Sequence, residues 1–394
     1  MTKKKSRGRT EDIRVAIVYE PLYKMGGGEL HLKYILEAFP NSELFTAYYD
    51  KELVEKEFPN IKINHSFMQY LPWREKLRYL YLLLNPLAYK TFNFKEYDVI
   101  LSLSSHFSKF AHTEGVPHID ECLTPPKFLW QKDDRTLKDK GKLTGINRVF
   151  FRFYSFFMDT FLEDIWKKWD KKAMQKCTRI IANSNVVKER IKKFYDSDSD
   201  VIYPPVEVEK ILKYPQVNRK ENWYLYLGRI ETYKGVELAI RACDELDLPL
   251  KIAGTGADLE AMKELVDDLG AKGIVKFLGY VSEGEKYELL SRAKALLFPV
   301  RGEDFGIVPV EANAFGTPVI GYKDGGTMET ISEENPKTGV FFDKYTVKSL
   351  TAVLKKFKAE EYTQDNCRKQ AQNFTSELFV YKLQNYVKDT LQDN

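Results

Sequence analysis

Residues 298–330 read FPVRGEDFGIVPVEANAFGTPVIGYKDGGTMET and contain the clearest indication of the fold. The apolar run at residues 295–299 leads into it and predicts a buried strand that ends at a proline. Beyond Pro309 the apolar spacing predicts a helix that ends near Gly316. Glu303 is therefore expected between a strand end and a helix start, which is where an open α/β sheet binds its ligands.

The same order of strand, loop and helix occurs at the start of each half of the chain. Residues 14–19 predict a strand, which is followed by the glycine run 26–28 and a helical pattern. Residues 223–227 predict another strand, which is followed by Arg229 and Lys234. These two cations are expected at the carboxyl end of their strand, where they would hold a diphosphate. The repeated order predicts an α/β protein with two doubly wound domains.

Other strands and helices are expected between these landmarks. The additional strands are predicted at residues 42–49, 61–64, 97–102, 179–184, 250–256 and 274–281, and the additional helices at 283–293, 345–358 and 363–391.

Composition excludes several classes of protein. A length of 394 residues suits about two domains, and an apolar share of 43% excludes wholesale disorder. A net charge of +4 does not indicate a nucleic-acid binder, and the four widely spaced cysteines suggest neither a disulfide framework nor a zinc site. No secretory signal is visible, and the apolar run at residues 79–84 is too short to span a membrane. Free cysteines fit a reducing cytosol, so a cytoplasmic location is expected.

Several motifs occur together and in order. Glu303-x7-Glu311 encloses Phe305-Gly306, and it is followed by GTPV at residues 316–319 and by GG-x-x-E at residues 325–329. This combination resembles the donor-site signature of the retaining nucleotide-sugar glycosyltransferases of family 4. Four further motifs, SSH at 104–106, TPPKFLW at 124–130, IANS at 181–184 and VIYPPV at 201–206, are similar to the mannosyltransferase branch of that family. The resemblance extends from residue 13 to about residue 387.

The resemblance implies a fold and a reaction. The fold would be the glycosyltransferase B fold, with two Rossmann-like domains facing across a cleft. The expected divisions are a basic tail (1–12), an N-terminal acceptor domain (13–205), a linker (206–220), a C-terminal nucleotide-sugar donor domain (221–375) and a helix that returns to the first domain (376–394). The reaction would transfer a hexose, mannose from GDP-mannose, with retention and without a metal or other cofactor. The acceptor would be a glycan or a polyprenyl-linked glycan of cell-surface polysaccharide synthesis.

The resemblance also implies roles for individual residues. Glu303, Arg229 and Lys234 would be catalytic. The donor would be bound by Gly27, Gly28, Gly228, Arg229, Lys234, Gly254, Gly279, Tyr280, Val281, Glu303, Phe305, Gly306, Ile307, Val308 and Glu311. Glu303 would contact sugar hydroxyls and Glu311 the ribose. The acceptor and sugar side would be formed by Ser105, His106, Thr124 and Lys127.

One segment departs from the branch pattern and keeps other functions open. The branch has His-Thr-Pro-Pro-Arg where this chain has Leu123-Thr124-Pro125-Pro126-Lys127. The histidine of the branch is absent, and lysine in place of arginine keeps the charge but loses the bidentate fork. The alternatives are a UDP-sugar transferase or a sugar phosphorylase of the same fold, and a non-catalytic nucleotide-sugar-binding subunit.

Three basic or aromatic segments raise the question of a membrane partner. Residues 1–14 carry a run of lysines and arginines, which suits either a solvated tail or weak attraction to anionic lipid. Residues 67–94 and 149–172 interleave aromatic residues with cations, which suits either core packing or an amphipathic face at a membrane surface. Peripheral contact with an anionic membrane, at the inner face of the cell membrane, is therefore a further expectation.

Overall fold

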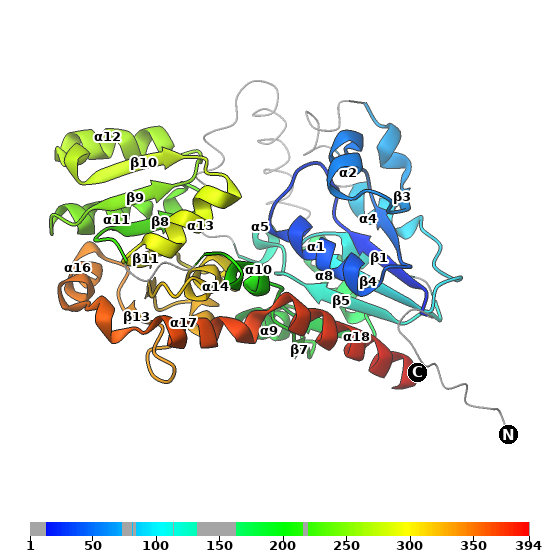
Figure 1. Ribbon diagram of the computed structural model, residues 1–394. Coiled ribbons are helices and arrows are strands. Elements are labelled where there is room, and N and C mark those ends of the chain that lie inside the picture. The colour runs from blue at the N-terminus through cyan, green and yellow to red at the C-terminus, as the bar shows by residue number, and fades with distance from the viewer. Residues whose placement is uncertain are drawn as a thin grey trace. The chain divides into compact units, whose positions relative to one another are not determined.

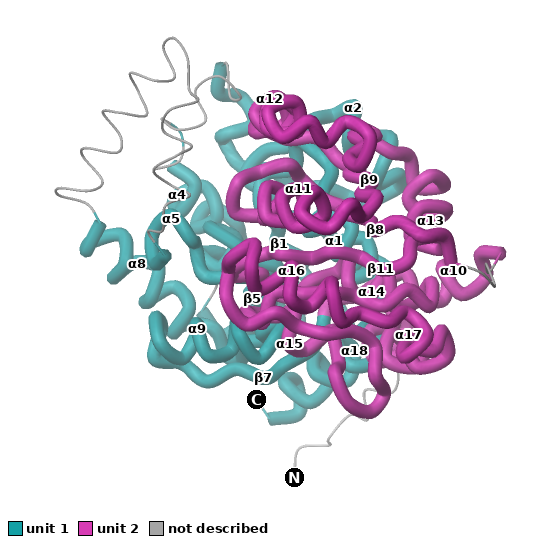
Figure 2. Tube along the Cα trace, turned by 90° about the vertical axis from the view of Figure 1, so that its left-hand side faces the viewer, with its two compact units in different colours: residues 1–203, 379–394 teal, residues 204–378 magenta. Residues whose placement is uncertain are grey.

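The structure of this protein is a computed structural model that describes residues 13–72, 81, 84–112, 114–131, 163–215 and 220–393. The basic tail and the first part of the aromatic segment 149–172 lie outside these residues, as do positions 73–80 and 216–219. The chain forms two compact units (Figure 2). Unit 1 comprises residues 1–203 and 379–394, and unit 2 comprises residues 204–378.

Unit 1 is built on a parallel sheet in the order β3-β2-β1-β4-β5-β6-β7 (Figure 1). Its strands are β1 (Val15–Tyr19), β2 (Glu43–Thr46), β3 (Ile63–His65), β4 (Val99–Ser104), β5 (His118–Cys122), β6 (Arg179–Ala182) and β7 (Asp200–Val201). Its helices are α1 (Gly27–Ala38), α2 (Lys51–Glu57), η2 (Phe67–Tyr70), α4 (Asn85–Lys90), η4 (Ser108–Phe110), α5 (Lys127–Trp130), α8 (Glu163–Gln175), α9 (Asn185–Tyr195) and the last helix, α18 (Ser376–Asp393).

Unit 2 is built on a second parallel sheet, in the order β10-β9-β8-β11-β12-β13. Its strands are β8 (Tyr224–Leu227), β9 (Leu250–Ala253), β10 (Val275–Gly279), β11 (Ala295–Phe298), β12 (Val319–Tyr322) and β13 (Gly339–Phe342). Its helices are α10 (Val208–Leu212), η6 (Thr232–Lys234), α11 (Val236–Asp244), α12 (Leu259–Leu269), η7 (Ala271–Gly273), α13 (Glu283–Arg292), α14 (Ile307–Ala314), α15 (Thr327–Thr330), α16 (Val347–Lys356), η8 (Ala359–Glu361), α17 (Gln364–Ala371) and η9 (Gln372–Phe374).

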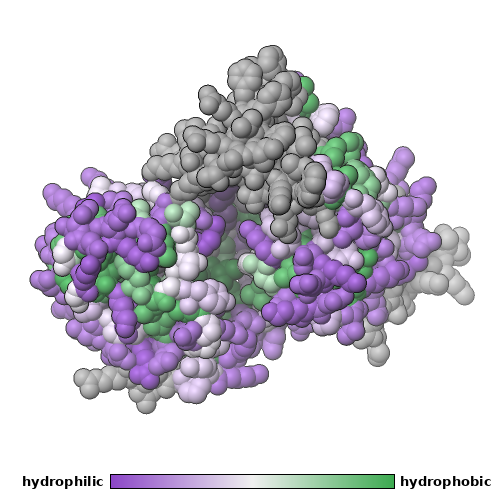
Figure 3. Space-filling model, turned by 90° about the horizontal axis from the view of Figure 1, so that it is seen from above, coloured by the Kyte–Doolittle hydropathy of each residue, from purple (hydrophilic) through white to green (hydrophobic). Residues whose placement is uncertain are grey.

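The central strands of each sheet consist mainly of apolar residues, and these strands are buried. Every residue of β1, β8 and β11 is buried, which is typical of parallel sheets that carry helices on both faces. Hydrophilic side chains dominate the surface of each unit that is visible in Figure 3. Among the described residues, no helix combines the length and the apolarity needed to cross a membrane.

The structure differs from the sequence predictions at several places. Strand β5 was not predicted, because its sequence HIDEC contains His118, Asp120 and Glu121, and strands β12 and β13 were not predicted either. The glycine run forms the first turn of α1 and is not a loop, since the helix begins at Gly27. The helix expected over residues 363–391 is divided into α17, η9 and α18. Phe379 and Leu383 of α18 belong to the apolar core of unit 1, so the chain end packs there.

Candidate functional site

The candidate site of unit 2 lies at the carboxyl ends of β8 and β11. These two strands are hydrogen-bonded neighbours and run parallel, so the loops that follow them leave the sheet at the same edge. The loop after β8 carries Arg229 and Lys234, and the loop after β11 carries Glu303. The strand order therefore brings together residues that are far apart in the sequence.

Lys234 and Glu303 form an ion pair. The Nζ atom of Lys234 lies 2.6 Å from Oε2 of Glu303, and both side chains are mostly but not fully buried. The ammonium group has three N–H donors, so it can bind a second acceptor while it keeps this carboxylate. The pair joins the two segments that the sequence singled out for diphosphate and sugar binding.

Arg229 is placed differently from Lys234. Its guanidinium donates to Oε1 of Glu231 at 2.9 Å and to the hydroxyl of Tyr233 at 2.6 Å, and its side chain is 65% exposed. The ammonium group of Lys234 lies 5.3 Å from the centroid of the Tyr233 ring, and the guanidinium carbon of Arg229 lies 6.0 Å from it. The two cations therefore flank one tyrosine, and only Lys234 reaches a predicted glutamate.

Glu311 has a lysine of its own, which the sequence analysis missed. Oε1 of Glu311, on α14, accepts a hydrogen bond of 2.7 Å from Nζ of Lys286, on α13. Burial raises the pKa of Glu311, and the nearby Lys286 opposes that shift. The sequence pattern of Ser282 and Glu285, a capping box, indicates where α13 begins. No neighbouring residue in the sequence indicates that the Lys286 side chain contacts α14.

The start of α14 has the backbone geometry of an anion site. Gly306 precedes the helix with a φ of +100°, a conformation that favours glycine. The first N–H groups of any helix lack partners inside the helix, so those of Ile307 and Val308 are oriented to bind a negative charge. Phe305 is buried and contacts Phe374, with ring centroids 5.4 Å apart. Its side chain therefore anchors the loop, and its backbone is the part that could meet a ligand.

Close backbone contacts hold the loops of this edge together. A side chain at Gly254 would collide with the carbonyl of Gly228, so the loops after β8 and β9 can approach only because position 254 is glycine. A side chain at Gly325 would likewise collide with the carbonyl of Glu303, which accepts a hydrogen bond of 2.9 Å from the N–H of Gly326. The position of Glu303 thus depends on the loop after β12.

The residues predicted after β10 lie at the edge of the sheet. Gly279 ends that strand and its carbonyl accepts a hydrogen bond of 2.7 Å from the N–H of Gly254. Tyr280 is 84% exposed. Val281 lines a hollow of about 270 Å³ together with Trp223 and other residues.

In unit 1 the start of α1 meets the segment that departs from the branch pattern. A side-chain carbon at Gly28 would lie 2.6 Å from the Tyr19 hydroxyl and 3.7 Å from Cδ1 of Leu123. Leu123 thus stands where the branch has its histidine, and it packs beside the glycine run that includes Gly27. No larger residue fits at position 28 without displacing Tyr19.

The loop after β4 is held by a carboxylate that the sequence analysis missed. Oε1 of Glu20 accepts hydrogen bonds from the backbone N–H groups of four successive residues, at 3.3, 2.8, 2.8 and 3.2 Å for residues 105, 106, 107 and 108. Successive N–H groups of this kind form an anion-binding concavity. Glu20 fills it, so these four N–H groups hold the loop in place and are not available to a substrate.

The predicted acceptor residues are brought together in part. The Ser105 hydroxyl lies 2.8 Å from Nδ1 of His106, and the His106 ring is stacked on Phe128 with centroids 5.9 Å apart. Phe128 follows Lys127 at the start of α5, so the loop after β4 and the start of α5 are neighbours. The Thr124 hydroxyl makes a long contact of 3.4 Å to the carbonyl of Pro125.

Within the described ranges, no three histidine, cysteine, aspartate or glutamate side chains gather in a way that could hold a metal ion. That the reaction needs no metal or other cofactor stays a prediction.

Residues 207–374 match the sequence model of the family described as glycosyl transferases group 1. This segment forms nearly all of unit 2. It contains Arg229, Lys234, Glu303 and Glu311.

Curated relatives extend the similarity. The chain is 32% identical over 173 residues to the O-antigen chain mannosyltransferase RfbU of Salmonella typhimurium. The aligned region covers 42% of this chain and 48% of RfbU. It is 26% identical over 351 residues to the alpha-1,3/1,6-mannosyltransferase ALG2 of Kluyveromyces lactis, which covers 74% of this chain and 65% of ALG2. The chain thus spans about half the length of the first relative and just under two thirds of the second.

Solved structures share the fold. The sucrose-phosphate synthase of Thermosynechococcus elongatus aligns with a TM-score of 0.73 at 17% identity and covers 97% of this chain and 100% of that one. The two parallel-sheet Rossmann-like domains are those of the glycosyltransferase B fold, so the predicted fold is confirmed. That the domains face each other across a cleft stays a prediction. At this level of identity, the likeness carries information on the fold alone.

Proposed function

We propose that this protein is a retaining, metal-independent glycosyltransferase that moves mannose from GDP-mannose to a glycan or lipid-linked acceptor in cell-surface polysaccharide synthesis. The observation that carries the proposal is the ion pair of Lys234 and Glu303 at the carboxyl ends of β8 and β11. The pair lies inside the segment that matches the group 1 glycosyltransferases. Mannose is supported by the names of RfbU and ALG2, which are both mannosyltransferases.

The proposed chemistry follows from the charges at this edge. Lys234 gives one N–H to Glu303 and has two left for phosphate oxygens, so it can hold the donor diphosphate without losing the carboxylate. The exposed guanidinium of Arg229 and the N–H groups at the start of α14 would add to the positive field. Charge that develops on the departing nucleotide would be stabilised by these groups, which already stand in place before the reaction.

The carboxylates have a different task in this proposal. Glu303 would accept hydrogen bonds from hydroxyls of the transferred sugar, and Glu311 from the ribose. Each glutamate is already paired with a lysine, Lys234 or Lys286, and the pairing orients its carboxylate. In unit 1, Ser105, His106, Thr124 and Lys127 would form the side of the acceptor and the sugar.

A thermal-shift panel tests the choice of donor. GDP-mannose, UDP-glucose, UDP-GlcNAc and ADP-glucose are added separately to the full chain at high concentration. A ligand present at about 100 times its dissociation constant adds about 2.7 kcal/mol to the free energy of unfolding, which is readily measured. GDP-mannose is expected to give the largest rise in melting temperature. A larger rise with a UDP-sugar would contradict GDP-mannose as the donor.

A transfer assay tests the catalytic roles. Glu303→Gln and Arg229→Gln are compared with Glu260→Gln, which removes a carboxylate of the same kind from an exposed lysine pair on α12. Rates of sugar transfer are expected to fall about a hundredfold in the two site variants, as for loss of one preorganised charge, and to stay unchanged in the control. Rates within about twofold of the parent in both site variants would contradict the assignment.

A second function is favoured by one observation, the leucine at position 123. Leu123 packs against the start of α1, where the branch has a histidine that can exchange a proton. A non-catalytic nucleotide-sugar-binding subunit would give a thermal shift with GDP-mannose but neither transfer nor hydrolysis of the donor. The two measurements together therefore separate the candidates.

A further inference from the structure

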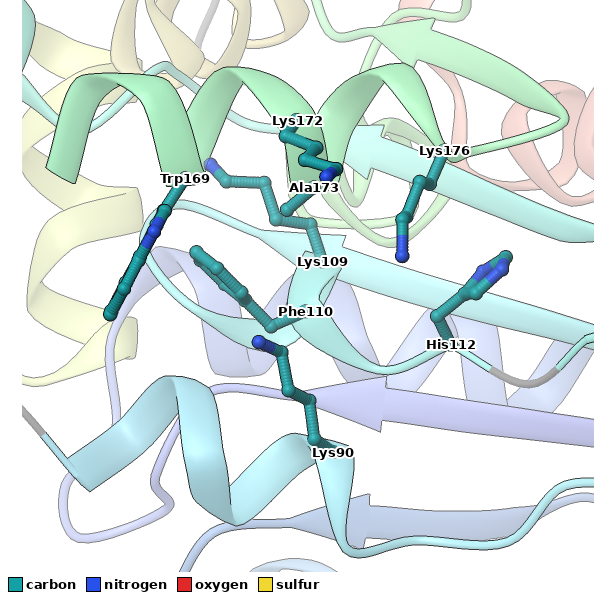
Figure 4. A pocket seen from close by; sticks show the side chains of 8 residues that line it. All are labelled: Lys90, Lys109, Phe110, His112, Trp169, Lys172, Ala173 and Lys176. Carbon is teal, nitrogen blue, oxygen red and sulfur yellow. The ribbon is translucent and has the colours of Figure 1, made fainter. Parts of the chain in front are cut away.

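A pocket of about 330 Å³ lies in unit 1, and none of its lining residues is among those that the sequence assigned to the donor or the acceptor (Figure 4). Figure 4 shows α8 along one side of it and Lys90, at the end of α4, on the opposite side. The pocket is lined by Lys90, Lys109, Phe110, His112, Trp169, Lys172, Ala173 and Lys176.

The charge of this lysine pocket is strongly positive. Four of its eight lining residues are lysines, and none is an aspartate or a glutamate. Lys109 is fully buried and its Nζ lies 2.9 Å from Oδ1 of Asp170, so its charge is compensated. Lys90, Lys172 and Lys176 form no ion pair with a carboxylate of the described residues. Three uncompensated ammonium groups around one hollow favour an anionic ligand.

Aromatic side chains stand next to these cations. Nζ of Lys90 lies 5.8 Å from the ring centroid of Phe110 and 5.9 Å from that of Trp169. Trp169 is 51% exposed, and its indole forms one end of the lining (Figure 4). A phosphate held by the lysines would therefore have an apolar surface beside it.

The exposed side of α8 changes from apolar to cationic along the helix. Ile165, Trp169 and Lys172 are spaced by four and three residues and share one face, and Lys176 continues that face directly beyond the helix end. Ile165 and Trp169 are exposed large apolar residues, and so is Leu87 on α4, which carries Lys90. Apolar side chains beside a group of lysines are the composition of a surface that meets lipid headgroups and the start of their acyl chains.

We propose that the lysine pocket binds the phosphate group of a lipid, with the lysines on the phosphate and Trp169 and its apolar neighbours on the lipid chain. Lysine binds phosphate as a point charge, and tryptophan is enriched where an apolar and an aqueous phase meet. The pocket would hold unit 1 against a lipid phosphate. This binding does not require the donor site of unit 2 and goes beyond the proposed transfer reaction.

Vesicle sedimentation with the full chain tests the proposal without any nucleotide sugar. The probes are phosphatidylcholine vesicles with and without phosphatidic acid, whose headgroup is a bare phosphate. The double variant Lys172→Gln/Lys176→Gln is compared with Lys188→Gln/Lys193→Gln, which removes the same charge from exposed lysines of α9 in the same unit. All four side chains are exposed, so both variants are expected to fold, which circular dichroism checks.

The parent is expected to sediment with the phosphatidic acid vesicles only. The affinity of the pocket variant should fall about thirtyfold, since each lysine near an anionic lipid surface contributes about 1 kcal/mol. The α9 variant should stay within about threefold of the parent. Equal losses in both variants would show attraction by net charge and would overturn the proposal.

A second arm separates a lipid phosphate from a free one. Trp169→Ala is expected to weaken binding to the vesicles and to leave the affinity for inorganic pyrophosphate, measured by calorimetry, unchanged. A parent that binds pyrophosphate but not the vesicles would overturn the lipid as ligand. Because no donor is present, failure of these experiments would leave the transferase proposal untouched, and loss of transfer activity would leave this one untouched.

Discussion

Strands β5 and β11 occupy similar positions, inside parallel sheets, yet their sequences are opposite in character. All residues of both strands are buried. β11 reads ALLF and carries its charged residue, Glu303, in the loop beyond the strand. β5 reads HIDEC and carries His118, Asp120 and Glu121 within the strand itself. The charged residue lies beyond the strand in β11, and ionisable residues lie within the strand in β5.

In unit 1 the buried side chains of β5 contact polar groups of other elements. Asp120 accepts hydrogen bonds of 2.5 and 2.8 Å from Ser102 and Ser104 of β4. Oε1 of Glu121 lies 2.8 Å from Nε2 of His31, on α1. These contacts lie inside the fold and serve stability. The comparison teaches that an ionisable residue indicates a site only where it remains accessible, as Lys234 and Glu303 do.

Loss of a buried partner in unit 1 should have the largest effect on stability. Asp170 accepts hydrogen bonds from Lys109, Trp130 and Tyr195, and Lys109 is fully buried. Asp170→Ala leaves that ammonium group uncompensated and is expected to lower the free energy of unfolding by about 3–5 kcal/mol. Urea denaturation measures the loss, and a loss below about 1 kcal/mol would contradict the role of this network.

The matching change in unit 2 should affect activity far more than stability. Lys234→Met removes a cation from a pair that is mostly but not fully buried, so the free energy of unfolding is expected to fall by less than the about 3–5 kcal/mol expected for Asp170→Ala. Transfer should fall about a hundredfold or more, because the donor diphosphate loses its lysine. Lys263→Met, in an exposed pair on α12, is the control and should change neither quantity. Equal losses of transfer activity in Lys234→Met and Lys263→Met would show that Lys234 has no special role in the reaction.

The buried groups of β5 should also be visible in the pH dependence of stability. Burial raises the pKa of Asp120 to about 6 and lowers the pKa of His118 to about 3. Between about pH 4 and pH 6 the folded Asp120 keeps a proton that the unfolded chain loses, so its contribution falls as the pH rises. His118 stays unprotonated in the folded state where the unfolded chain is protonated, so its contribution rises with pH.

In the parent, the contributions of Asp120 and His118 to the pH dependence of the free energy of unfolding have opposite signs and partly cancel. Single variants separate the two contributions. Asp120→Asn removes the contribution that falls with pH, so from about pH 4 to pH 6 its free energy of unfolding is expected to rise by about 2 kcal/mol relative to that of the parent. In His118→Gln the change relative to the parent should have the opposite sign. Urea midpoints measured across this range give both slopes, and the same sign in the two variants would refute the assignment.

The smallest effect is expected for the second pair of unit 2. Lys286→Gln removes the partner of Glu311 but keeps a hydrogen-bond donor of similar length. Without the lysine the buried carboxyl group is protonated more readily, so it accepts ribose hydrogen bonds less well at low pH. The dissociation constant for GDP-mannose should rise about threefold to tenfold, and calorimetry at two pH values measures it. An unchanged dissociation constant at both pH values would contradict a role of Glu311 in donor binding.

Local patterns sufficed for most of unit 2. The strands β8 and β11 were predicted from apolar runs, and the loops beyond them from glycine and proline positions. The resemblance implied that both loops belong to one site, and the pairing of β8 with β11 brings Lys234 to Glu303. Apolar patterns did not predict β5, because the polar side chains of this strand contact residues of β4 and α1, which are distant in the sequence.

Loop positions and the chemistry of the donor loops follow from residue types that act within a few positions of one another, and so they can be deduced from the amino-acid order. The pairing of Glu311 with Lys286, the capture of the loop after β4 by Glu20, and the lysine pocket between α4 and α8 follow from contacts between distant segments. These depend on how the helices pack on the sheet, and packing is determined by the folded chain as a whole.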